Sequence, residues 1–145
     1  MKSVTRILAS ALMLVISVSM TQANASTSTS LGMAYDNNLS IAIEVNEMAH
    51  ITVSPNTFSA DFHLVQGALD GSSIPFNGYT GVGMFYDTTV SDSEEIGVRF
   101  PMGVDMIVAF NTKVYVQVHP ELYISDETDS LELELGWAFG VQYTF

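Results

Sequence analysis

Apolar and polar residues alternate without a break through the last stretch of the chain, residues 131–145. Every second residue is large and apolar: Leu131, Leu133, Leu135, Trp137, Phe139, Val141, Tyr143 and Phe145. The residues between them are charged, small or polar. Because successive side chains of a strand point to opposite faces, this pattern predicts a two-faced β-strand. The stretch is longer than the about 5–6 residues of an ordinary strand and reaches the roughly 9–11 residues that cross a bilayer.

Seven further alternating segments precede this one, at residues 28–36, 39–46, 49–54, 58–66, 77–87, 95–107 and 114–124. Residues rich in Asn, Asp, Gly, Pro and Ser separate them, as is typical of turns. Pro101 and Pro120 lack a backbone donor, so each predicts a local irregularity in its strand. The sequence therefore predicts an all-β protein, an eight-stranded antiparallel up-and-down β-barrel.

Composition indicates where the apolar faces of these strands point. Hydrophobic residues make up 48% of the chain and charged residues 14%, yet no apolar run of helical membrane length follows the first twenty residues. Apolar content supplied by alternation favours a transmembrane barrel over a helical membrane protein. Lipid would then contact the apolar faces, and the charged and small residues would line the lumen. Both termini would lie on the periplasmic side, with the acidic loops at 87–94 and 125–130 outside.

Residues 1–25 have the features of a secretory signal peptide. Lys2 and Arg6 supply the positive region, residues 7–20 the apolar region, and Ala23-Asn24-Ala25 a small-residue cleavage site. Cleavage would leave residues 26–145 as one barrel domain beyond the inner membrane.

The chain carries a formal net charge of −12 and no cysteine. Nucleic acid is a poor partner for so acidic a protein, because binding it requires cations that neutralise phosphates. The absence of cysteine excludes disulfides, thiolate metal sites and a lipid-modified N-terminal cysteine.

The predicted inward face carries many charges: Glu44, Asp61, His63, Glu95, Arg99, Asp105, His119, Glu121, Glu132 and Glu134. The interior of an eight-stranded barrel is just wide enough for side chains to fill, and charges enclosed there must be paired or hydrated. We expect Arg99, Glu121, Glu134, Asp61 and Asp105 to form a lumen charge network. Glu121 and Glu134 are the expected partners of Arg99.

Two histidines are weak candidates for chemistry. Asp61 and His63 share a face, as do His119 and Glu121, so either carboxylate is a candidate to orient a histidine base. Residues two apart on a strand are separated by about 7 Å, and no serine has a recognisable nucleophile context. His63 and His119 also lack the close spacing of a metal motif. We therefore predict no catalytic residues, no metal and no cofactor.

The alternating last strand with its terminal aromatic residue resembles the final strand of bacterial outer-membrane β-barrel proteins. That resemblance implies an assembly signal in Trp137, Phe139, Val141, Tyr143 and Phe145, recognised by periplasmic chaperones and the outer-membrane assembly machinery. Three segments, Gly97–Gly103, Val114–Pro120 and Gly136–Phe145, also look like an uncharacterised family of small eight-stranded outer-membrane barrels. This resemblance implies a fold and a location in a Gram-negative outer membrane, without an established activity.

The sequence thus predicts a small integral outer-membrane protein with a filled, polar lumen and a structural or surface-interaction role. One alternative is a soluble periplasmic, lipocalin-like barrel that points Leu133, Trp137 and Phe139 inward around an apolar ligand. Others are a lipid A-modifying outer-membrane enzyme and a porin-like pore, whose conductance through eight strands would be small or absent.

Overall fold

The computed structural model describes residues 28–69, 71, 75–88, 94–125 and 130–145. They form nine strands: β1 (Thr29–Asp36), β2 (Asn38–Val45), β3 (Ala49–Val53), β4 (Thr57–Ala68), β5 (Phe76–Asp87), β6 (Glu95–Arg99), β7 (Met102–Ala109), β8 (Thr112–Ser125) and β9 (Ser130–Thr144). The predicted signal peptide and residues 89–93 and 126–129 of the acidic loops lie outside the described residues. No helix in the described part of the chain is long and apolar enough to cross a membrane.

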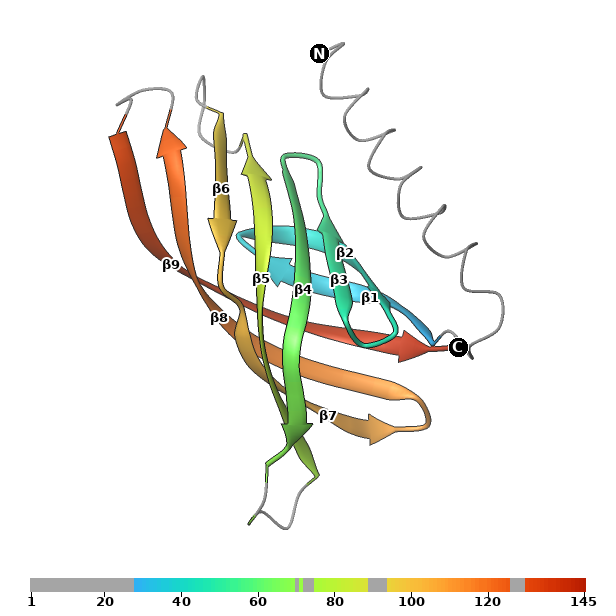
Figure 1. The fold of residues 1–145 in the computed structure, drawn as a ribbon. Coiled ribbons are helices and arrows are strands. Elements are labelled where there is room, and N and C mark those ends of the chain that lie inside the picture. The colour runs from blue at the N-terminus through green and yellow to red at the C-terminus, as the bar shows by residue number, and fades with distance from the viewer. Residues whose placement is uncertain (1–27, 70, 72–74, 89–93, 126–129) are drawn as a thin grey trace.

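The strands form one closed antiparallel sheet (Figure 1). The order is β4, β3, β2, β1, β9 and β8, then β6 and β7, then β5, which pairs with β4 and closes the barrel. β6 and β7 share one position, because each pairs with β5 on one side and with β8 on the other. The fold is therefore a closed eight-stranded barrel whose sixth position is divided into two strands. The prediction of a closed, eight-stranded antiparallel barrel is confirmed, with one additional strand.

Pro101 lies at the division between β6 and β7, where the sequence predicts an irregularity. Its carbonyl still accepts a hydrogen bond from the Gly81 amide, at 2.9 Å. The register on β5 and on β8 is the same before and after the gap. The missing N–H of Pro101 thus interrupts one strand without displacing it.

Pro120 does not interrupt β8, so the prediction of an irregularity there was wrong for this strand. β8 pairs with β9 through Pro120 and Leu135 without a register shift. The carbonyl of Pro120 accepts a hydrogen bond from the Phe100 amide at 3.0 Å, on the side away from β9. Because both backbone groups of a strand residue point to the same side, the missing N–H faces the gap between β6 and β7. The two prolines therefore meet at one point of the sheet.

The two faces of the barrel differ in chemistry, as the alternation predicts. Buried polar and charged side chains line the interior: Ser30, Asp36, Ser40, Glu44, His50, Thr52, Ser59, Asp61, His63, Asp87, Arg99, Gln117, His119, Glu121 and Gln142. The exterior carries exposed apolar side chains, and on β9 these include Leu133, Trp137, Phe139 and Val141. The interior of this barrel is a polar core.

Glycines on neighbouring strands make room for the rings in this narrow interior. A Cβ atom at Gly103 of β7 would lie 2.5 Å from the ring of Tyr79 on β5. A Cβ atom at Gly97 of β6 would lie 2.8 Å from the ring of Phe85, also on β5. Alternation along one strand places these rings inside, and the adjacent strands supply the space that each ring fills.

Candidate functional site

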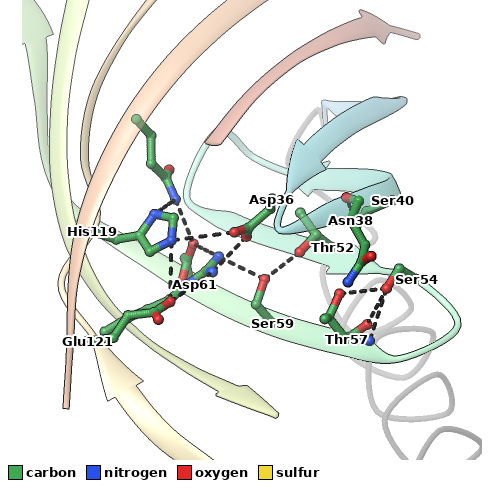
Figure 2. Close-up of polar contacts among 12 residues, drawn as sticks. Asp36, Asn38, Ser40, Thr52, Ser54, Thr57, Ser59, Asp61, His119 and Glu121 are labelled. Carbon is green, nitrogen blue, oxygen red and sulfur yellow. Dashed lines mark hydrogen bonds and ion pairs between the residues drawn. The ribbon is translucent and has the colours of Figure 1, made fainter. Parts of the chain in front are cut away.

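Arg99, the last residue of β6, is the centre of the lumen charge network. Its guanidinium binds Asp61 through two hydrogen bonds, Nε to Oδ1 at 2.7 Å and Nη2 to Oδ2 at 2.6 Å. Nη1 donates to Asp36 Oδ2 at 2.7 Å and Nη2 to Ser59 Oγ at 2.7 Å (Figure 2). Arg99 is 1% exposed. Its planar group thus joins β1, β4 and β6 from different sides of the lumen.

Gly83 of β5 allows the contact between Arg99 and Asp61. It pairs with Arg99 on β6 and with Asp61 on β4, so it lies directly between them in the sheet. A Cβ atom at this position would overlap Asp61 Oδ1 and lie 2.7 Å from the Ala60 carbonyl oxygen. Since no side chain stands between the two charged groups, the carboxylate reaches the guanidinium across β5.

His119 and Glu121 of β8 extend the network (Figure 2). His119 Nε2 lies 3.4 Å from Asp36 Oδ1 and 3.3 Å from Glu121 Oε1. Glu121 Oε1 lies 4.0 Å from Arg99 Nη1. Gln117 Nε2 contacts Asp61 Oδ2 at 3.4 Å and His119 Nδ1 at 3.3 Å. Strands β1, β4, β6 and β8 are therefore connected through the lumen as well as through the sheet.

The structure brings three of the five predicted network residues together, namely Arg99, Asp61 and Glu121. The expected pairing of Arg99 with Glu134 is not made, so this part of the prediction was wrong. Glu134 is exposed and accepts a hydrogen bond from Tyr123 Oη at 3.3 Å. Asp36 and Asp61 occupy the donors of the guanidinium instead.

Asp105 also lies away from Arg99, contrary to the expected network. It is half-buried on β7 and accepts a hydrogen bond from Asn77 Nδ2 at 3.2 Å. Arg99 and Asp105 belong to the same divided strand, and six residues of strand span about 20 Å. The alternation correctly predicted that both residues lie on the inner face. It does not show how deep in the barrel each one lies, and the two lie at different depths.

Asp36 is the network residue that sequence reasoning missed. It ends β1 and begins the run Asp36-Asn37-Asn38, whose residue types are typical of a turn because they tolerate left-handed conformations. Asn37 indeed has a φ of 56°. The available signal was the alternation itself, which places Asp36 on the same face as Ala34.

The two candidate histidines differ in their surroundings. His63 does not contact Asp61. Its Nδ1 lies 3.1 Å from the Glu47 carbonyl oxygen, and its ring stacks on Tyr79 with a centroid distance of 4.2 Å. His119 does contact its predicted carboxylate, Glu121. Among the described residues, the polar partners of these histidines are a backbone carbonyl, an amide and carboxylates, with no hydroxyl among them.

A second polar layer lies nearer the end of the barrel where β1 begins and β9 ends. Lys113 of β8 forms an ion pair with Glu44 of β2, two strands that do not pair with each other. His50 pairs with Glu44 in the sheet, and Gln142 pairs with Lys113. Together with Tyr115 on β8, they have buried side chains with polar atoms that find no hydrogen-bond partner among the described residues. Buried groups of this kind are usually satisfied by ordered water.

The cavity near Arg99 is small, and a larger cavity lies toward the end of the barrel where β1 begins. The cavity beside Arg99, Asp36 and Glu121 has a volume of about 10 Å³, which is about the space of one water molecule. A cavity of about 210 Å³ lies beside Glu47, Asp105 and Lys113. Within the described residues, no group of three or more potential ligands is placed to hold a metal ion.

Comparison of the chain with protein-family models, curated proteins and solved structures finds no match in any of the three. The features of this chain that bear on function are therefore the geometry of the barrel and the chemistry of its two faces.

Proposed function

We propose that this protein is an integral outer-membrane β-barrel with a filled, polar lumen and a structural or surface-interaction role without catalysis. Its partners would be outer-membrane lipids and the machinery that assembles such barrels. The exposed outer face of β9, which contains the predicted assembly signal, is available for that recognition.

The observation that carries the proposal is the apolar exterior, which continues around the barrel. Exposed apolar side chains occur on nearly every strand, and examples are Met33, Ile41, Phe62, Met84, Val98, Val104, Val116 and Trp137. A monomer in water rarely exposes a continuous apolar surface of this extent. In a bilayer the same surface lies in hydrocarbon, and closure of the sheet pairs neighbouring strands all the way around the barrel.

The interior supports a sealed lumen, not a pore. The Arg99 cluster crosses the lumen at one level and the Lys113–Glu44 pair at another. Eight strands enclose a space that side chains are able to fill. We therefore propose that the barrel conducts no steady ion current, and single-channel recording in planar bilayers tests this directly.

The orientation of the side chains on β9 does not favour the alternative of a soluble barrel with an apolar ligand inside it. It requires Leu133, Trp137 and Phe139 to point inward, and all three are exposed on the exterior. The interior holds charged side chains that an apolar ligand would strip of water, which is unfavourable. The alternative of a lipid A-modifying enzyme lacks a supporting observation, because His119 is fully buried inside the barrel.

Cell fractionation combined with gel electrophoresis tests the proposal. Recovery in the outer membrane, with faster migration before boiling than after it, would agree with a detergent-resistant barrel in lipid. Recovery in the soluble periplasm with one migration rate would contradict it. A secreted soluble protein of known location serves as the fractionation control.

A further inference from the structure

β9 extends well beyond the strand that pairs with one of its edges. β1 pairs only with residues Ala138–Thr144 of β9, whereas β8 pairs with residues Ser130–Tyr143. Among the residues that the structure describes, the first half of β9 therefore has a strand on one side only. Figure 1 shows this half of β9 at the border of the sheet, beside β8.

The backbone hydrogen bonds identify which residues point to the open edge. The Phe145 amide donates to Thr29 O, toward β1, and the Thr144 amide donates to Asn111 O, toward β8. Backbone groups alternate in direction along a strand, and the β8–β9 register has no shift. The N–H and C=O groups of Leu131, Leu133 and Leu135 consequently point away from β8, to the side where no described strand lies.

The side chains along this edge divide into an apolar face and an acidic face. Leu131, Leu133 and Leu135 are 70%, 73% and 66% exposed, against about half for the apolar residues further along β9. Glu132 and Glu134 lie on the other face of the strand. Three more carboxylates share that face on neighbouring strands: Asp87, Glu95 and Glu121.

Basic residues are scarce in this chain, which carries a formal net charge of −12. The four basic residues of the chain are Lys2, Arg6, Arg99 and Lys113. Of the two in the described part, Arg99 binds Asp36 and Asp61 and lies 4.0 Å from Glu121, and Lys113 forms an ion pair with Glu44. A strand added at this edge would place alternate side chains beside the acidic face and beside the leucines.

We propose that the edge of β9 at Leu131–Leu135 binds an extended segment of another protein as an added strand, with basic residues alternating with apolar ones. Open strand edges are templates for such pairing, in which backbone hydrogen bonds supply affinity and alternate side chains supply specificity. The inference depends on the barrel geometry and goes beyond the proposed membrane location.

A second copy of this chain is a poorer occupant of the same edge. Antiparallel pairing of two such edges aligns odd residues with odd residues, because these carry the outward backbone groups. In the register that places Leu133 opposite Leu133 and uses the whole edge, Glu132 of one copy would face Glu134 of the other. Like charges directly opposite each other destabilise a strand pair.

The test uses the full protein folded in detergent and a fluorescent peptide of alternating lysine and valine. Fluorescence anisotropy should show saturable binding, and a peptide of alternating glutamate and valine should not bind. A lysine–valine peptide with N-methyl groups on its pairing amides keeps the charges but loses the donors. It should bind at least about tenfold more weakly, because several backbone hydrogen bonds are lost.

Substitutions in β9 test the same backbone pairing by changing the barrel in place of the peptide. Leu133→Pro removes an outward N–H that no described strand uses, and proline is tolerated at such edge positions. It should weaken binding about tenfold, whereas Leu133→Ala, which keeps the amide, should stay within about threefold of the parent. Heat-modifiable migration checks that both variants fold.

Four results would overturn the proposal: equal binding of the N-methylated peptide, equal binding of the glutamate–valine peptide, an unaffected Leu133→Pro variant, or peptide displacement by dimerisation of the protein. The first and third would indicate attraction between charges alone, and the last would identify a second copy as the occupant. Peptide binding does not depend on where the barrel resides in the cell. The strand-pairing proposal and the membrane proposal are therefore tested independently, and either can be wrong without the other.

Discussion

Asp61 binds Arg99 through both carboxylate oxygens across Gly83, which belongs to the strand between them. Bidentate pairs between arginine and a carboxylate are among the stronger hydrogen-bonded contacts in proteins. Here the pair is buried, and it connects strands that are not direct neighbours. The stability of the barrel should therefore depend on the small size of residue 83 as well as on the two charges.

Gly83→Ala should destabilise the barrel by about 1–3 kcal/mol, because the added methyl group overlaps Asp61 Oδ1 and crowds the Ala60 carbonyl. The urea midpoint of the detergent-folded protein measures the effect. Gly67→Ala is the matched control, since a Cβ atom there meets nothing within 4 Å. Equal midpoints for the two variants would show that the space at Gly83 is not required.

Arg99→Leu should lower the free energy of unfolding by about 3–5 kcal/mol, because it leaves Asp36 and Asp61 buried without their cation. The temperature at which the folded band disappears on gels gives a second measure. Adding Asp61→Leu to this variant should recover part of the loss, since one uncompensated carboxylate is removed. A further loss in the double variant would argue against a desolvation origin.

Asp36→Asn and Glu134→Gln separate the observed network from the one that the sequence predicts. Asp36 accepts a 2.7 Å hydrogen bond from Arg99 inside the lumen, so its neutralisation should cost about 1.5–3 kcal/mol. Glu134 is exposed and bonds only weakly to Tyr123, so its replacement should change stability by less than about 0.5 kcal/mol. If the two replacements had the same effect on the urea midpoint, the network around Arg99 would be wrongly assigned.

Alternation alone was enough to predict most of the strands and the side of the sheet on which most residues lie. The reason is that the period of a strand is fixed at two residues, so one unambiguous apolar position determines its neighbours. Arg99 and Glu121 were placed inside the barrel by this rule, and both are buried there. Val65 is an exception, because the register of β4 shifts between His63 and Val65 and leaves its side chain exposed.

The partners across the lumen were not predictable in the same way. Asp36 and Arg99 come from β1 and β6, and their depths depend on how the closed sheet is staggered, which no local pattern records. Glu134 has the same inward phase as Glu121, but it lies on the half of β9 that extends past β1. The choice of face was therefore predicted correctly for these residues. Depth along the barrel separates Asp105 from the network, and Glu134, which lies opposite Glu121 in the sheet, is exposed because β1 does not extend beside it.

The most direct test of the membrane proposal uses Trp137, the only tryptophan of the chain, which is 53% exposed on the outer face. The purified protein is reconstituted into vesicles made with or without brominated acyl chains, and its fluorescence is recorded in both. We predict strong quenching by the brominated lipid and little quenching by acrylamide in the water. Fluorescence that acrylamide quenches and brominated lipid leaves unchanged would contradict the account, because the apolar exterior would then face water.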